Sequence, residues 1–361
     1  MACQSALIRK DDAAKTGQQN LAGAIMPPFA VLSGVTLLRL NLMKLPLGLL
    51  ATVLVSAAYA TPLSECLGYA PADKVLIVNA DDLGMHPELD RAAFRLIDKK
   101  LIQDISVMPP TPGFAKVAEM AKARGMAVGV HLTLTNEWQE KQPWGAVLPK
   151  SEVPSLYNDQ GNLWASVDEL VKHAKPEEVK REILAQIAKV QAAGLTVTHL
   201  DGHMLFWRGS KAFIDIYAGL ARETGIPTIS QFAGMSFEQQ LALNQGIQKD
   251  LGVVTPDTFT MLYNPALRRA GMRFPGYDNV LASLPAGVNH LIIHPAEDSP
   301  GAREAIADLQ LRLSDFDVWN GPEVHKVIQQ KKLKLTNYLP LKALQQQVDA
   351  SPKNCLQGGA R

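Results

Sequence analysis

The chain has 361 residues, of which 47% are hydrophobic and 20% are charged, and its formal net charge is +1. This length is enough for one large hydrophobic core or for two small domains. A nearly neutral chain without a dense cluster of lysine and arginine has little attraction for polyanions, so nucleic acid and anionic lipid are not expected partners.

The start of the chain has the pattern of a secretory signal peptide. Residues 43–60 begin with a short basic stretch, continue almost wholly apolar, and end in the small-x-small pattern Ala58-Tyr59-Ala60. We therefore predict cleavage after Ala60 and a periplasmic or secreted protein without a stable membrane anchor. Residues 1–42 are interpreted as an upstream extension. An uncleaved anchor is the alternative, although the apolar stretch is short for a membrane span.

If the protein is exported, two of its cysteines can form a disulfide bond. Cys66 and Cys355 lie near the two ends of the predicted mature chain, and Cys3 is lost with the leader. In an oxidising compartment the remaining two can form a disulfide bond that ties the termini together. Closing so long a loop gives roughly 5 kcal/mol in the chain-entropy model. Neither cysteine lies beside a catalytic-looking histidine, which argues against a thiol enzyme.

Strands and helices alternate along the predicted mature chain. Apolar runs predict strands at 75–80, 105–108, 127–134, 197–200, 228–232, 259–263 and 290–294. Amphipathic segments predict helices at 88–99, 115–124, 177–193 and 211–224, several of which end at a glycine (Gly125, Gly194, Gly225). This alternation predicts an α/β fold with a parallel sheet, closed or nearly closed into a (β/α) barrel of about seven strands. An open doubly wound sheet is the alternative, but no glycine-rich nucleotide motif follows any strand.

We expect residues 61–361 to form a single domain with an insertion at 136–175. The insertion follows the third predicted strand and is rich in proline, tryptophan and glycine, so it is interpreted as a lid or cleft wall, with a disordered surface loop as the alternative. Further helical segments at 304–313 and 339–348 could close the barrel or support a homodimer.

The first predicted strand ends in two adjacent carboxylates, Asp81 and Asp82. Its run of apolar residues suits a strand that is buried on both faces, and parallel α/β folds place their chemistry at the carboxyl ends of such strands. Adjacent side chains on an extended chain point in different directions, so the two acids can have different roles. The alternative is a helix N-cap, where aspartate is favoured.

Three histidines, His131, His203 and His294, lie inside or at the end of other predicted strands. Each alone would more often be a hydrogen-bonded core residue. If the strands are parallel, however, all three share one edge with Asp81 and Asp82, and burying so many titratable groups without a ligand is costly. One carboxylate with two imidazoles can hold a divalent metal ion and leave positions open, while a second carboxylate and a third histidine move protons. The pattern therefore predicts metal-assisted hydrolysis, with zinc or magnesium first and nickel, cobalt or manganese also compatible.

Four short motifs resemble the YdjC-like family, which includes the chitooligosaccharide deacetylases and belongs with the wider polysaccharide deacetylases. They are N-A-D-D-L-G at 79–84, G-V-H-L-T-L at 129–134, H-L-D-G-H at 199–203 and I-H-P at 293–295, in the order that the family shows. The resemblance covers roughly residues 74–297. It implies a distorted (β/α) barrel like that of polysaccharide deacetylases, a divalent metal, and hydrolysis of an N-acetyl group on a sugar.

The same resemblance implies roles for individual residues. Asp82 corresponds to the metal-binding carboxylate, with His131 and His203 as the histidine ligands. Asp81 corresponds to the general base and His294 to the acid that serves the leaving amine. The reverse assignment of the two aspartates stays open, because sequence cannot orient adjacent side chains.

Further residues lie near the predicted site. Asp201 is taken as a hydrogen-bond partner behind the ligands or as a cap, and His199 as structural, with direct catalysis as the alternative for both. Residues 204–208 replace the further histidines of many relatives, and residues 229–232 lack an arginine that is common there. Within the first of these segments, Trp207 could stack on a sugar ring or pack in the core.

The sequence thus predicts an exported, metal-dependent carbohydrate deacetylase that acts on N-acetylated sugars or oligosaccharides. One alternative is a metal-dependent esterase or amidase on the same barrel. Another is a non-catalytic sugar-binding protein, which the complete set of predicted ligands, base and acid argues against. A structural protein is the least expected.

Overall fold

A parallel sheet lies at the centre of the molecule. Its strands are β1 (Lys74–Leu83), β2 (Asp104–Val107), β3 (Val128–Leu132), β4 (Val197–Gly202), β5 (Thr258–Met261), β6 (Gly287–Ile293) and β7 (Lys334–Leu335). The order in this 7-stranded sheet is β4-β3-β2-β1-β6-β5, with β7 paired to β1, and every pair is parallel. The computed structural model describes residues 62–232, 234–262, 276–351 and 354–357. The predicted signal peptide and the extension before it lie outside these residues.

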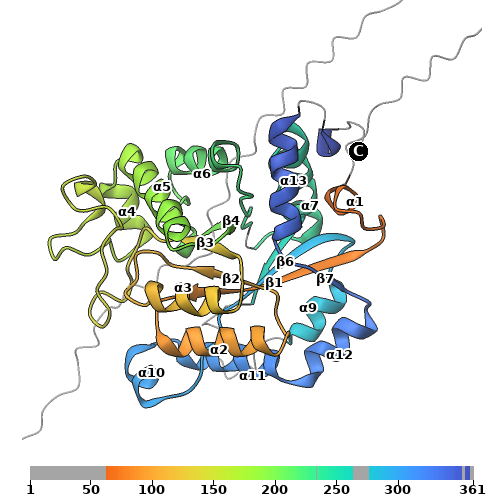
Figure 1. The fold of residues 1–361 in the computed structure, drawn as a ribbon, viewed down its shortest axis with the longest axis horizontal. Helices are drawn as coiled ribbons and strands as arrows, with labels where there is room; N and C mark the ends of the chain where they lie inside the picture. Colours follow the sequence, from red (N-terminus) through yellow and green to blue (C-terminus); the bar gives the residue numbers. More distant parts are fainter. Residues whose placement is uncertain (1–61, 233, 263–275, 352–353, 358–361) are drawn as a thin grey trace, which may run out of the picture. The chain divides into compact units, whose positions relative to one another are not determined.

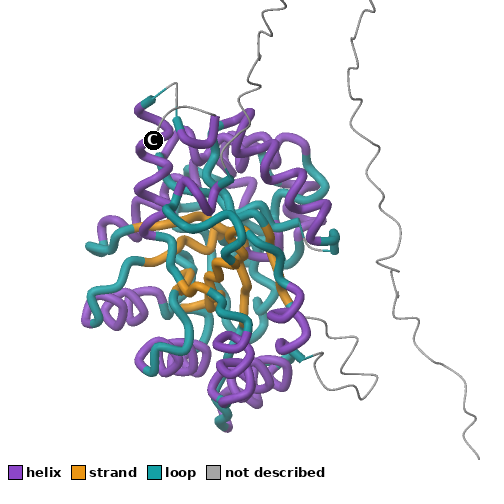
Figure 2. The backbone as a smooth tube through the Cα atoms, turned by 90° about the vertical axis from the view of Figure 1, so that its right-hand side faces the viewer, coloured by secondary structure: helices purple, strands orange, loops and turns teal. Residues whose placement is uncertain are grey.

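Helices connect the strands and surround the sheet (Figure 1). They are α1 (Leu63–Cys66), α2 (Pro87–Asp98), α3 (Phe114–Ala123), α4 (Val167–His173), α5 (Pro176–Ala192), α6 (Lys211–Thr224), α7 (Phe237–Gly246), α9 (Tyr277–Ser283), α10 (Pro300–Ala305), α11 (Leu309–Asn320), α12 (Pro322–Gln330) and α13 (Leu339–Ala350). Figure 2 shows the strands gathered in the middle with helices outside them. In the part of the chain that the structure describes, no helix has the length and apolar character needed to cross a membrane.

The curled parallel sheet confirms the predicted α/β class and the distorted (β/α) barrel. The helices predicted at 88–99, 115–124, 177–193 and 211–224 each lie within one residue of α2, α3, α5 and α6. The glycines predicted to end three of these helices all adopt positive φ, at Gly125, Gly194 and Gly225.

The predicted strand at 228–232 is wrong. This segment forms only an isolated parallel bridge, between Thr228 and Leu200 of β4. Beyond the bridge, side chains replace the ladder: the Ser230 amide donates to a threonine hydroxyl, and the Gln231 side chain accepts from a β4 amide. The segment still lines the open edge of β4, because the Ile229 amide donates to the Leu200 carbonyl at 3.0 Å.

The C-terminal part departs from prediction at two places. The helix predicted at 304–313 is two helices, because α10 ends before Ile306, whose backbone is extended and whose side chain is buried, and α11 starts at Leu309. The sequence also gave no sign of β7, whose two residues, Lys334 and Leu335, are too few to show a pattern. The predicted helix at 339–348 corresponds to α13.

Both faces of strand β1 are buried, which explains why its sequence is apolar without alternation. Leu76 and Val78 belong to the large core beneath the surrounding helices. Val75 and Ile77 face the opposite way, into a second cluster that includes Tyr338 and residues of α13. Since side chains alternate along a strand, the positions that follow Val75 and Ile77 on this second face are Asn79 and Asp81.

The second face becomes polar toward the carboxyl ends of the strands. Its buried polar side chains are Asn79, Asp81, Asp104, Ser106, His131, His199, Asp201 and His290. Ser106 of β2 hydrogen-bonds to Asp201 of β4 at 3.0 Å although β3 lies between these strands in the sheet order. The contact shows that this face is the concave inside of the curled sheet.

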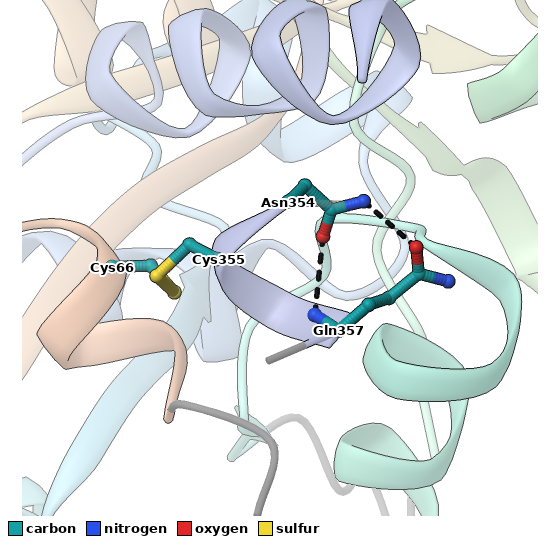
Figure 3. The surroundings of a disulfide bond; sticks show 4 residues. All are labelled: Cys66, Asn354, Cys355 and Gln357. Carbon is teal, nitrogen blue, oxygen red and sulfur yellow. Dashed lines mark hydrogen bonds between the residues drawn. A yellow bond between two sulfur atoms is a disulfide. The ribbon is translucent and has the colours of Figure 1, made fainter. Parts of the chain in front are cut away.

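A disulfide bond joins Cys66 to Cys355, as the sequence suggested, with Cα atoms 5.8 Å apart (Figure 3). The bond links the end of α1 to the 3₁₀ turn at Cys355–Gln357. Leu63 of α1 and Leu356 of the turn both pack in the second cluster, beside the start of β1. Both ends of the described chain are therefore fixed at the end of the barrel opposite the polar layer.

The insertion at 136–175 has defined structure and is held by α5. Glu182, buried on α5, accepts hydrogen bonds from the amides of Val147 and Leu148 at 2.8 and 3.0 Å. Glu178, one turn earlier, accepts from the amide of Ser155 at 2.7 Å. These carboxylates satisfy backbone donors of three partly buried residues, and so they fix the insertion beside β3.

Candidate metal centre

Both adjacent aspartates lie within β1, which ends at Leu83, three residues beyond the predicted end of the strand at residue 80. The pairing with β2 shifts register between Ala80 and Leu83, and Asp82 has φ of 67°, in the left-handed region. Such an irregularity changes the direction of a side chain that would otherwise point to the other face of the sheet. It explains how two neighbouring residues both reach the site, and it stores about 1–3 kcal/mol of backbone strain.

Asp82, His131 and His203 meet at the carboxyl edge of the sheet. Asp82 Oδ1 lies 3.3 Å from His131 Nε2 and 3.3 Å from His203 Nδ1. One oxygen or nitrogen from each of the three lies within 4.8 Å of the others, and all three side chains are buried. His131 comes from the end of β3, and His203 begins the turn directly after β4. The residues predicted as metal ligands are thus brought together.

A buried arginine holds the other oxygen of Asp82. Arg312 of α11 donates through Nη1 to Asp82 Oδ2 at 2.8 Å, and its Nε lies 3.1 Å from Asp308. Burial alone would raise the pKa of Asp82, but Arg312 and the two histidines together lower it well below its usual value. Asp82 is therefore a carboxylate at neutral pH, with Oδ1 directed to the histidines and Oδ2 to the guanidinium.

The second nitrogen of His131 faces a carboxylate network inside the barrel. His131 Nδ1 lies 3.0 Å from Asp201 and 3.7 Å from Asp81. Ser106 bridges these two acids at 2.9 and 3.0 Å, and Asn79 donates to Asp81. Burial and the charge of Asp201 raise the pKa of Asp81 well above its usual value. The predicted role of Asp201 as a hydrogen-bond partner behind a ligand agrees with this geometry.

The second nitrogen of His203 faces Glu137, from the insertion. His203 Nε2 lies 3.1 and 3.0 Å from the two carboxylate oxygens of Glu137. Burial lowers the pKa of His203, but Glu137 and Asp82 raise it to about 9. In the same way, Asp201 and Asp81 outweigh burial and raise the pKa of His131 well above its usual value. Both histidines are therefore protonated, and their positive charges compensate the surrounding carboxylates. A bound divalent cation would compensate the same negative charge.

His294 follows β6 directly and lies near the same group. Its backbone amide donates to Asp315 at 2.8 Å. Burial lowers the pKa of its imidazole to about 3, although the charge of Asp82 opposes this. His294 is therefore neutral before any reaction, close enough to Asp82, His131 and His203 for each to influence its protonation.

His199 and Trp207 have packing roles. The His199 ring stacks on Tyr338 with centroids 3.8 Å apart, and a Cβ added to Gly129 would lie 2.2 Å from His199 Nε2. Burial lowers the pKa of His199 to about 4, so its ring is neutral. Trp207 stacks on Tyr217 at 4.1 Å and occupies the space beside Gly202. One face of Trp207 therefore packs in this structure, and stacking of its other face on a sugar ring stays a prediction.

The donor set fits a divalent cation of the zinc or magnesium kind. One carboxylate oxygen and two imidazole nitrogens are ligand types that such ions accept, and three protein ligands leave positions for water or substrate. A second group of potential ligands, Asp81, His131 and Asp201, shares His131 with the first. There His131 Nδ1 already has a hydrogen-bonding distance to Asp201, so that side of the ring serves orientation.

Three contributors to the site escaped the sequence analysis: Glu137, Arg312 and Ser106. Glu137 was one residue of an insertion known only by composition. Arg312 lay in a predicted helix, where nothing distinguishes a buried arginine from an exposed one. Ser106 had a detectable signal, because it is a polar residue inside the apolar run that was predicted as the next strand after the one ending at Asp81.

The fold and the site define a (β/α) barrel whose buried Asp and His residues gather at the carboxyl edge of its sheet. The family model described as YdjC-like protein matches residues 75–330. The chain belongs to this family, as the motifs suggested.

Individual relatives cover most of the chain. A carbohydrate deacetylase from Enterococcus faecalis (strain ATCC 700802 / V583) is 27% identical over 271 residues, which are 74% of this chain and 98% of that protein. A carbohydrate deacetylase from Thermus thermophilus is 29% identical over 269 residues, 71% of this chain and 89% of that protein. A solved structure from Enterococcus faecalis V583, described as a cellobiose-phosphate cleavage protein, has a TM-score of 0.60 and 26% identity and covers 74% of this chain and 98% of that one.

Proposed function

We propose that this protein is a metal-dependent hydrolase that removes N-acetyl groups from amino-sugar oligosaccharides. The observation that carries the proposal is the buried cluster in which Asp82 Oδ1 lies 3.3 Å from a nitrogen of both His131 and His203. Membership of the YdjC-like family and similarity to two proteins named carbohydrate deacetylase support deacetylation as the reaction.

In this proposal Asp82, His131 and His203 hold the cation. When bound, a divalent cation supplies positive charge that stabilises an oxyanion and lowers the pKa of water and of neighbouring acids. Among the described ion pairs His203 contacts Asp82 and not Asp81, which favours Asp82 as the ligand over the reverse assignment. Arg312 keeps the ligand carboxylate ionised and leaves one of its oxygens free to face the histidines.

Asp81 acts as the general base and His294 as the general acid. Asn79 and Ser106 hold Oδ1 of Asp81, and its raised pKa makes the ionised form a stronger proton acceptor than an ordinary aspartate. His294 is neutral at the start, so the proton that it gives to the leaving amine must be one that it receives during the same turnover. The reaction breaks the amide C–N bond of the acetamide, adds water, and releases acetate and the amine.

Acetate release from N-acetylglucosamine oligomers, measured on chelator-treated and metal-reloaded protein, tests the proposal. Reloaded wild type should release acetate, and His131→Ala should lower the rate at least about a thousandfold, because the stabilisation at stake is several kcal/mol. His325→Ala, which changes a histidine of α12 that bonds to a backbone carbonyl, is the matched control and should keep activity. Full activity of metal-free His131→Ala refutes the assignment.

The same assay separates the alternatives. Release from O-acetyl esters but not from N-acetyl sugars would identify an esterase. Tight sugar binding by the reloaded protein without any acetate would identify a sugar-binding protein.

We also propose that the protein acts outside the cytoplasm, in the periplasm or medium, and that residues 61–361 form the mature enzyme. The disulfide between Cys66 and Cys355 supports an oxidising compartment, where such bonds persist. N-terminal sequencing of the exported protein tests this: the expected first residue is Thr61, and a cytoplasmic, uncleaved chain would contradict it.

A further inference from the structure

We propose that Glu137 is a positioning residue of the metal centre, through which the insertion at 136–175 sets how tightly the cation is held. The inference rests on the proposed function, because it concerns the same three ligands. It extends the proposed function by giving a role to Glu137 and to the insertion at 136–175, neither of which supplies a metal ligand.

The geometry of His203 carries the argument. Its two ring nitrogens face two different carboxylates: Nδ1 lies 3.3 Å from Asp82, and Nε2 lies 3.0 Å from Glu137. A neutral imidazole has one nitrogen with a hydrogen and one with a free electron pair. If Glu137 accepts the hydrogen on Nε2, the electron pair is on Nδ1 and points to the position that a cation would share with Asp82. Glu137 thus selects the tautomer that can bind.

The backbone on either side of Glu137 is held firmly. The side chain of Asn136 is fully buried, and its carbonyl oxygen accepts from the amide of Trp138 at 2.9 Å. Its amide group donates to the carbonyl of Trp144 at 3.3 Å, and its backbone amide donates to the carbonyl of Trp164 at 2.8 Å. Glu137 therefore presents its carboxylate from a turn that Asn136 ties to two distant parts of the insertion.

The two ligand histidines differ in what orients them. The partner of His131 is Asp201, which is fully buried and belongs to the barrel itself. The partner of His203 is Glu137, whose side chain is 25% exposed and belongs to the insertion. The sheet therefore orients His131, whereas the insertion at 136–175, which was interpreted as a lid or cleft wall, orients His203. A movement of that segment away from the barrel would release His203 before it released His131.

Calorimetric titration of Zn²⁺ into the chelator-treated full-length protein tests the inference. Loss of such an orienting partner typically weakens metal binding by 10–100-fold, so Glu137→Ala should raise the Kd of Zn²⁺ by about that factor. Glu137→Gln keeps a carbonyl acceptor of the same length and should fall between wild type and Glu137→Ala. Glu140→Ala, at an exposed position three residues further along the same segment, is the control and should keep the wild-type Kd.

Thermal unfolding of the metal-free variants separates orientation from a general structural role. The inference requires that metal-free Glu137→Gln is still folded at the temperature of the titration while its Kd is raised. An unchanged Kd in both Glu137 variants overturns the inference alone, since wild-type binding would still support the proposed function. If wild type binds Zn²⁺ and Mg²⁺ no more tightly than His131→Ala does, the proposed function fails and this inference fails with it.

Discussion

The two ends of the barrel carry side chains of opposite character. At the start of β1, Val75 and Ile77 pack against Tyr338 in an apolar cluster beside the Cys66–Cys355 bond. At the other end of the same strand, about 20 Å away at roughly 3.3 Å per residue, Asp81 lies in a layer of buried acids and histidines. One strand therefore joins an end built for packing to an end that carries charge.

The difference indicates where stability and function reside. Buried charges stabilise a fold only where their partners and hydrogen bonds are complete, whereas apolar burial stabilises it wherever packing is good. In (β/α) barrels the carboxyl ends of the strands carry the chemistry and the opposite end contributes stability. Changes at the disulfide end should thus alter unfolding without altering the site, whereas changes at the polar end should alter the site and, where they remove a buried charge or disturb packing, stability as well.

The largest expected effect on stability comes from the disulfide. The double variant Cys66→Ser/Cys355→Ser opens a loop with a sequence separation of 289 and should lower the free energy of unfolding by about 2–5 kcal/mol. Chemical denaturation measures this, and Zn²⁺ titration of the same protein should return the wild-type Kd. A large loss of Zn²⁺ affinity would contradict the prediction that changes at the disulfide end leave the metal site unaltered.

A pH profile sharpens the comparison at the polar end. Asp90 accepts a hydrogen bond from the amide of Gly84, two residues after Asp82, and burial raises its pKa from 3.8 to about 7. The folded state binds this proton more tightly than the unfolded state, so the contribution of Asp90 to stability is complete below pH 3.8 and is lost as pH rises to 7.

Asp90→Asn keeps the acceptor and cannot ionise. Relative to wild type, the variant should therefore gain stability between pH 4 and pH 8, by up to about 4 kcal/mol. Denaturation midpoints across this pH range measure the gain, with the exposed Asp159→Asn as the matched control. A constant difference between Asp90→Asn and wild type would contradict the prediction.

Gly129→Ala should affect both stability and the site, because Gly129 lies where the apolar and polar layers meet. The added Cβ would lie 2.2 Å from the His199 ring, which is itself stacked on Tyr338. Overpacking of this kind costs about 1–3 kcal/mol of stability, and displacement of β3 would move His131, two residues away. We expect a lower unfolding temperature together with a raised Kd for Zn²⁺. Gly219→Ala, where a Cβ meets nothing within 4 Å, is the control.

The sequence predicted those parts of the fold that depend on local pattern. The apolar run before Asp81, the glycine after each of three helices, and the order of strands and helices each follow from a short stretch of residues. The strand prediction at 228–232 failed because the β-branched and aromatic residues of Thr-Ile-Ser-Gln-Phe match a strand, while side-chain acceptors such as Gln231 replace the ladder partners. Which acceptors are available there depends on tertiary contacts.

The site divides in the same way. Asp81, Asp82, His131, His203 and His294 could be predicted because each ends or follows a strand, and parallel strands end at one edge. The partners that orient and charge these residues could not, since they come from elements whose position in space the sequence does not specify. Arg312 reaches Asp82 across 230 positions, and Glu137 reaches His203 across 66.

Anomalous diffraction from crystals soaked in Zn²⁺ tests the central claim most directly. The account predicts one strong peak at bonding distance, about 2.0–2.2 Å, from Asp82 Oδ1, His131 Nε2 and His203 Nδ1. No peak there in fully soaked crystals, or a peak on the other side of His131 among Asp81 and Asp201, would contradict it.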